Sequence, residues 1–161
     1  MSTEPGGIAV SEAVRTLLLL MPRLVGRAKR LPMPPQLRDL DLAPRHLALL
    51  AHLEYDGPAS VNELADRLEV APTTVSLMVS ELARPGILRR ATDPSDRRRR
   101  IIAIAPDYTE PIRTWLSGSA TAWEHVMNNL SPTERTTVVT ALRSYETALH
   151  HQAQPKDEPK A

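Results

Sequence analysis

Cysteine and phenylalanine are absent from the 161 residues, and only two tryptophans and three tyrosines are present. Without cysteine the chain cannot form disulfides, thiolate metal sites or thiol-based redox sensors. The core must then be built from Leu, Val, Ile, Ala and Met, which favours helices. The apolar run Leu17–Met21 lies between Arg15 and Arg23 and is far shorter than the ~20 residues that a membrane-spanning helix needs. We therefore expect a globular cytoplasmic protein with no membrane segment and no secretory signal.

Positive charge is concentrated in one short segment. The net charge is only +1, although 17 arginines and 3 lysines are present, so an affinity for nucleic acid would have to be local. Four arginines, Arg97–Arg100, follow directly after Asp93 and Asp96. A solvated loop that attracts any polyanion weakly is the alternative interpretation of this run.

The first part of the sequence predicts two helices. Apolar residues recur at helical spacing from near Ile8, and Pro22 is expected to kink or divide this helix. Residues 31–35 contain three prolines and form a connector. A second helix begins near Pro44 and stops at residues 56–58. Its expected core positions are Leu47, Leu50, Ala51 and Leu53.

Two short helical patterns follow and are separated by a brief turn. Ser60 and Glu63 form a capping box for the first, whose apolar positions are Val61, Leu64, Ala65 and Leu68. Pro72 opens the second. Val70 in the turn is expected to be a buried plug. This arrangement predicts a helix-turn-helix. The helix that begins at Pro72 should bury Val75, Met78, Val79 and Leu82.

A β-hairpin is expected next, because the β-prone runs 87–90 and 100–104 flank the turn-rich residues 93–96. Asp93 is expected to cap the turn. One long helix follows, with apolar positions from Ile112 to Leu130.

A second capping box, Ser131 to Glu134, opens the last helix. Its apolar stripe is expected to be Val138, Leu142, Tyr145 and Leu149. The polar residues 152–161 are expected to be disordered.

Together these elements resemble the MarR family of bacterial winged helix-turn-helix regulators. The resemblance is carried by Asp93-Pro94-Ser95-Asp96-Arg97-Arg98, by Gly86-Ile87-Leu88-Arg89-Arg90, and by Val61–Ala65 leading to Thr74-Val75-Ser76. It implies a mainly α fold with a small β-hairpin, in which a winged helix-turn-helix domain is joined to a helical dimerisation region. The implied division is an N-terminal dimerisation helix and connector (1–43), a DNA-binding domain (44–106), C-terminal dimerisation helices (107–151) and a disordered tail (152–161).

DNA recognition is expected from two elements. The helix 72–84 would enter the major groove, and the wing 88–104 would reach the minor groove. As the resemblance implies, Arg97 or Arg98 would insert into the minor groove, while Asp96 would orient the arginine side chain. The expected DNA-binding residues are Ser60, Thr73, Thr74, Ser76, Leu77, Ser80, Arg84, Arg90, Asp96, Arg97, Arg98 and Arg99.

The recognition helix also departs from the family pattern. Many family members carry basic residues at the positions of Leu77 and Glu81, which the sequence assigns to the outer face of the helix. Glu81 near phosphates would lower affinity, so the wing should supply a larger share of the binding energy. Solvation of an ordinary surface helix is the alternative interpretation of this polar face.

A symmetric homodimer acting on a pseudo-palindromic operator, most often as a repressor, is the function that the resemblance implies. A small aromatic ligand could release it, and Pro22, residues 31–35, His46 and Arg15 or Arg23 could line the ligand crevice. A non-specific architectural DNA-binding protein and a zinc-responsive regulator are the alternatives. No metal site or cofactor is expected, because no histidine pair has helical i, i+4 spacing. Catalysis is not expected either, since no nucleophile, base or phosphate loop has a suitable spacing.

Overall fold

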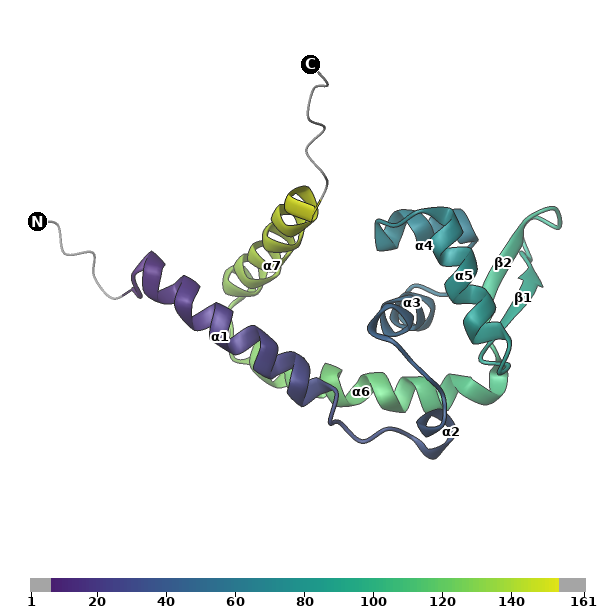
Figure 1. Cartoon of the computed structure of the whole chain (residues 1–161), viewed down its shortest axis with the longest axis horizontal. Helices are drawn as coiled ribbons and strands as arrows, with labels where there is room; N and C mark the ends of the chain where they lie inside the picture. Colours follow the sequence, from purple (N-terminus) through teal and green to yellow (C-terminus); the bar gives the residue numbers. More distant parts are fainter. Residues whose placement is uncertain (1–6, 154–161) are drawn as a thin grey trace, which may run out of the picture. The chain divides into compact units, whose positions relative to one another are not determined.

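The structure is a computed structural model that describes residues 7–153. The contacts divide the chain into two compact units, Met1–Ser119 and Ala120–Ala161, which are described separately below. No helix in the described part is long and apolar enough to cross a membrane. Figure 1 shows the elements of residues 7–153 in order: α1 (Val10–Ala28), α2 (Pro35–Arg38), α3 (Pro44–Tyr55), α4 (Val61–Leu68), α5 (Pro72–Ala83), β1 (Leu88–Thr92), β2 (Arg100–Ile104), α6 (Pro106–Asn128) and α7 (Pro132–Ala153).

The core of the first unit lies between α3, α4, α5 and the hairpin, and the start of α6 packs against it. All four apolar positions predicted for α5 are buried, so its helical periodicity is confirmed. In α3 the predicted Leu50 and Leu53 are buried and Ala51 is partly buried. The predicted Leu47 is exposed, and Leu49, which was not predicted, is fully buried instead. The largest buried side chains of this core are Leu37, Leu49, Leu50, Leu64, Val75, Val79, Leu82, Ile87, Ile102 and Ile112.

The helix-turn-helix predicted from the sequence is confirmed, but its turn differs in one respect. Glu69 ends α4 in the left-handed region, with φ 52° and ψ 42°. Val70 donates its N–H to the Ala65 carbonyl (3.1 Å) and remains 37% exposed, so the prediction of a buried plug was wrong. Leu68 at the end of α4 packs against the core instead.

The hairpin is also confirmed. Strands β1 and β2 are antiparallel, with Arg90 opposite Ile102 and Thr92 opposite Arg100. Gly86, with φ 84°, turns the chain from α5 into β1 in a conformation that favours glycine. Ala59 forms an isolated bridge with Ile102, which fixes the start of α4 beside β2.

The N-terminal helix is not divided at Pro22. Helix α1 continues through this proline to Ala28. The proline removes one N–H, and both it and Leu18 lie at exposed positions, where water can bind the carbonyl left unpaired. The connector contains the short helix α2, which the sequence did not predict and which begins at Pro35 because proline suits the first helical position.

Helix α6 begins at Pro106, before its first predicted apolar position, and it is one continuous helix as expected. Its first half belongs to the first unit, where Ile112 is fully buried. Arg113 donates from Nε to Oε1 of Glu54 on α3 (2.7 Å), which joins α6 to the core of the first unit.

The second unit contains the end of α6 and helix α7. The predicted capping box is present: Ser131 N–H donates to Glu134 Oε2 (2.7 Å), and Glu134 N–H donates to Ser131 Oγ (3.3 Å). Leu142, Tyr145 and Leu149 of the predicted stripe are exposed in the single chain. Helix α7 includes Gln152 and Ala153, so it extends two residues into the predicted tail, while residues 154–161 lie outside the described part.

Candidate nucleic-acid interface

The outer face of α5 is polar and open to solvent. Helix α5 begins at Pro72 without a side-chain cap. Pro72 has no N–H and the Thr74 N–H donates to the Ala71 carbonyl (2.9 Å), so in the first turn it is the Thr73 N–H that can attract an anion. Leu77 is 58% exposed, as an apolar contact for a thymine methyl group requires. The hydroxyl of Ser80 donates to the Ser76 carbonyl (2.8 Å) and is partly occupied by its own helix. The exposed predicted residues on this helix and its C-cap are Thr73, Thr74, Ser76, Leu77, Ser80 and Arg84.

Glu81 was expected from the sequence to point outward, but in the structure it faces α3. Its Oε2 lies 2.7 Å from His46 Nε2 and 3.2 Å from Arg45 Nη2, both on α3. The pKa of Glu81 is lowered from its ordinary value, mainly by the hydrogen bond with His46 and next by the hydrogen bond with Arg45. The negative charge of Glu81 near the end of α5 is therefore turned towards α3 and compensated there.

His46 was expected to line a ligand crevice, and the structure corrects this. It is 4% exposed. The Ala43 N–H donates to its Nδ1 (3.2 Å). Because Nδ1 accepts, the neutral ring carries its proton on Nε2 and donates it to Glu81. Nδ1 therefore helps to cap the start of α3, and Nε2 holds α5 on α3 through Glu81.

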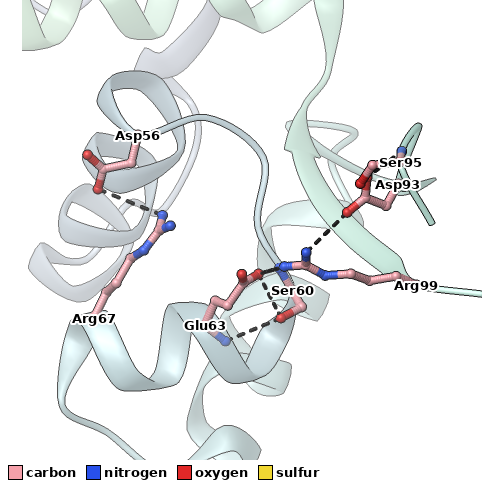
Figure 2. Close-up of polar contacts among 7 residues, drawn as sticks. All are labelled: Asp56, Ser60, Glu63, Arg67, Asp93, Ser95 and Arg99. Carbon is pink, nitrogen blue, oxygen red and sulfur yellow. Dashed lines mark hydrogen bonds and ion pairs between the residues drawn. The ribbon is translucent and has the colours of Figure 1, made fainter.

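Ser60 caps α4 and also lies beside the wing (Figure 2). The Ser60 N–H donates to Glu63 Oε2 (2.8 Å), and the Glu63 N–H donates to Ser60 Oγ (3.3 Å). The Ser60 hydroxyl itself donates to Glu63 Oε2 (2.9 Å). The Ser60 hydroxyl therefore uses both its donor and its acceptor in the helix cap.

The turn of the wing is built by its two aspartates. Asp93 Oδ1 accepts from the Ser95 N–H (2.8 Å), which confirms its predicted capping role. Asp96 Oδ1 accepts from the backbone N–H of Arg98 (2.9 Å). Asp96 thus shapes the backbone of the loop. Among residues 7–153 its carboxylate forms no hydrogen bond or ion pair with an arginine side chain, contrary to the expectation from the sequence.

Arg99 is the arginine whose side chain is engaged by carboxylates. Its guanidinium forms ion pairs with Glu63 on α4 and with Asp93 on the wing, the latter at 3.2 Å. The hydrogen bond from the Ser60 N–H is the largest cause that lowers the pKa of Glu63, and the hydrogen bond from Arg99 is the next; together they bring the pKa to about 2. Figure 2 shows Arg99 lying between the two carboxylates. Glu63 was recognised from the sequence only as a cap, because nothing in the spacing links residues 63 and 99.

The remaining arginines of the wing are exposed. Among the described residues, Arg97 and Arg98 make no side-chain hydrogen bond or ion pair, and Arg90 on β1 makes none either. Arg100 donates to the Thr92 hydroxyl (3.2 Å) across the hairpin. Free guanidinium groups at a hairpin tip can pair with phosphates or enter a narrow minor groove.

A shallow open groove of about 430 Å³ lies between the connector and the first half of α6. Residues 32–36 line it together with Arg38, Glu110, Pro111 and Thr114. Of the predicted crevice residues only the connector contributes to this groove. In the described part of the chain, no three His, Asp or Glu side chains are grouped closely enough to hold a metal ion.

Residues 42–99 match the MarR family. The "HTH-type transcriptional repressor MdtR" of Bacillus subtilis (strain 168) is 37% identical over 57 residues, which cover 35% of this chain and 37% of that relative. A MarR family protein from Bacillus stearothermophilus has a similar solved structure, with a TM-score of 0.58 and 19% identity over 88% of this chain and 95% of that one. The PcaV transcriptional regulator from Streptomyces coelicolor, solved in complex with its natural ligand, has a TM-score of 0.58 and 16% identity over 89% and 99% of the two chains. At these identities the structural likeness establishes the fold.

Proposed function

Because residues 42–99 form a MarR-family domain, we propose that the chain is a sequence-specific transcriptional regulator that binds double-stranded DNA. The recognition helix, residues 72–84, occupies the major groove, and the wing, residues 88–104, reaches the adjacent minor groove. A regulator of this kind acts in the cytoplasm of a bacterium, and no catalytic step is part of the proposal.

The observation that carries this proposal is the exposure of Arg97 and Arg98 at the wing tip next to an exposed polar helix face. Within residues 7–153 neither guanidinium has a side-chain partner, so DNA binding breaks no existing ion pair. The hairpin contacts α5 directly, so the two DNA-binding elements are parts of one packed unit. This geometry favours a binding mode in which α5 contacts the major groove and the wing contacts the minor groove.

The roles within the interface follow from side-chain chemistry. Thr73 and Thr74 at the uncapped start of α5 bind a phosphate or a base edge, and Ser76 faces the bases beside them. Leu77 contacts a thymine methyl group. Arg84 and Arg90 neutralise phosphates on either side. Since α5 carries no Lys or Arg on its outer face before Arg84, the wing supplies the larger part of the electrostatic binding energy.

The active species is a homodimer. Helix α1 has no buried residue in the single chain, and α7 also exposes large apolar side chains. Monomeric proteins rarely expose such continuous apolar surface, and a second copy would cover it. We assign residues 1–43 and 107–151 to dimerisation and residues 44–106 to DNA binding. Two-fold symmetry then sets two recognition helices about one DNA turn apart, on a pseudo-palindromic operator.

Repression is the sign of control that we propose, because MdtR is described as a repressor. Release by a small aromatic acid extends the proposal, and the structure of PcaV with its natural ligand supports a response to a small ligand in general. The open groove between the connector and α6 offers Arg38 as a cation for a carboxylate, although its Nε already donates to the Met33 carbonyl (3.0 Å). Isothermal titration of the free protein with aromatic carboxylates tests this extension, and Arg38→Gln should weaken the binding that is found.

Selection of bound fragments from the source genome tests the main proposal. We expect a pseudo-palindromic site to be enriched, and binding to that site to withstand a large excess of random duplex at moderate salt. Competition by random DNA as effective as by the selected site would instead support a non-specific architectural protein and would contradict sequence-specific regulation.

The wing assignment has its own test. Arg97→Ala combined with Arg98→Ala should flatten the salt dependence of binding, by a slope of about 0.9 for each phosphate that the wing no longer neutralises. Ser76→Ala should instead change the preference among sequences and leave the slope unchanged. An unaltered slope in the double variant would argue against the wing in the minor groove.

A further inference from the structure

We propose that Arg99 is a positioning residue that fixes the wing against the helix-turn-helix by bridging Glu63 and Asp93, and that it does not itself bind DNA. This inference rests on the proposed DNA-binding function and assigns different roles within the arginine run. It removes Arg99 from the DNA-contacting set that the sequence suggested and adds Glu63 to the residues on which DNA recognition depends.

The backbone of Arg99 is held on both sides by the wing loop. Its N–H donates to the Asp96 carbonyl (2.9 Å), and its own carbonyl accepts from the Asp93 N–H (3.0 Å). The direction in which the side chain leaves the loop is therefore fixed, whereas the neighbouring arginines continue to the exposed tip. From this anchored start the guanidinium spans the space to α4 (Figure 2).

Glu63 receives Arg99 while it also caps α4. The same carboxylate accepts from the Ser60 N–H (2.8 Å) and from the Ser60 hydroxyl (2.9 Å). An arginine suits this position because its planar fork can reach two carboxylates at once, which a lysine ammonium does less well. Any displacement of the wing tip would stretch an ion pair to a group that is itself held at the first turn of α4.

The charge balance also separates Arg99 from its neighbours. Arg99 faces two carboxylates, and its side chain is about 39% exposed. Hydrogen bonding and attraction to Glu63 raise its pKa. To bind a phosphate, Arg99 would have to give up partners that Arg97 and Arg98 lack among the described residues. Holding the loop in place before DNA arrives reduces the ordering cost when those two arginines bind.

Three matched substitutions separate positioning from direct contact. Arg97→Gln should lower the slope of log affinity against log salt by about 1 per wing. Arg99→Gln should leave the slope unchanged and weaken binding about 2- to 30-fold, the range expected for losing a surface ion pair in each wing. A fall in slope for Arg99→Gln equal to that of Arg97→Gln would overturn the inference.

Glu63→Gln provides the sharper test because the two explanations predict opposite signs. Glutamine retains an oxygen that can complete the capping box, so α4 should remain folded. Removing a negative charge near DNA would strengthen binding if Glu63 had no positioning role. We expect weaker binding, and we expect the Glu63→Gln, Arg99→Gln double variant to be no weaker than either single variant. Tighter binding by Glu63→Gln, or additive losses in the double variant, would contradict the bridge.

The mobility of the wing loop in the free protein tests the bridge without DNA. Amide order parameters of residues 93–99 should fall from about 0.85 towards 0.6 in Arg99→Gln and Glu63→Gln and should stay unchanged in Arg97→Gln. Unchanged order in all three variants would overturn the inference while leaving the DNA-binding function intact. A wild-type chain that fails to bind any duplex, but shows this loss of order in the variants, would refute the proposed function and preserve the bridge.

Discussion

Replacing Leu18 by Ala should weaken dimerisation and leave the fold of the single chain intact. Leu18 lies on α1 and is 62% exposed, so its truncation removes little buried surface from one chain. Full burial of a leucine side chain is worth about 2 kcal/mol, and a partner that covers the exposed part would gain about 1 kcal/mol. The loss occurs in both copies of a symmetric dimer, so the dissociation constant should rise about 30-fold.

Sedimentation equilibrium over a range of protein concentrations measures this change. Thr16→Ala is the matched control, because Thr16 is exposed on the same helix and carries no large apolar group. Urea unfolding of both variants at one low concentration should show that the single chain keeps its stability to within about 0.5 kcal/mol. A dissociation constant unchanged by Leu18→Ala, or a wild-type chain that stays monomeric, would refute the assignment of α1 to the dimer interface.

Three further predictions concern the first unit. Ser60→Ala removes the cap of α4 and should destabilise the chain by about 1 kcal/mol in urea unfolding; no loss would mean that the cap does not form. Ile112→Ala, at a fully buried position of α6, should cost about 2–5 kcal/mol, and a loss below about 0.5 kcal/mol would show that α6 does not pack on this core. The pKa of Glu63 falls from 4.5 to about 2 on folding, so its contribution should be present above pH 4.5 and lost as the pH falls towards 2. Unfolding at stepped pH should show a flatter acid limb in Glu63→Gln, and an identical acid limb would contradict this lowered pKa.

Much of the DNA-binding unit could be predicted from the sequence because its signals are local. The capping residue Ser60 and the apolar spacing of α5 depend on neighbours within one or two turns. The hairpin follows from β-prone runs on either side of a turn whose aspartates bond their own backbone. These features need no knowledge of the rest of the fold.

The contacts that orient the interface could not be predicted in this way. Glu81 pairs with His46 from a position 35 residues away, and Arg99 pairs with Glu63 across 36 residues. Helical spacing places Glu81 on the side away from the apolar stripe, but only the packing of α3 determines which groups it meets. The exposure of Val70 likewise follows the left-handed turn at Glu69, which the sequence of the turn does not reveal.

These long-range pairs change the interpretation of the recognition helix. From the sequence, an acidic residue at position 81 was expected to oppose DNA binding, yet the carboxylate faces α3, where Arg45 and His46 compensate its charge. The absence of basic residues on the outer face of α5 then shifts the electrostatic share of binding to the wing. For this reason the position of the wing, and hence the bridge through Arg99, should matter more in this chain than in one with a basic recognition helix.

Methylation protection on the selected operator distinguishes the two grooves, because dimethyl sulfate modifies guanine N7 in the major groove and adenine N3 in the minor groove. We expect two blocks of guanine protection about one helical turn apart, each flanked by adenine protection that disappears in the Arg97→Ala, Arg98→Ala variant. Guanine protection with no adenine protection beside it, or adenine protection that survives in that variant, would contradict binding by one element in each groove.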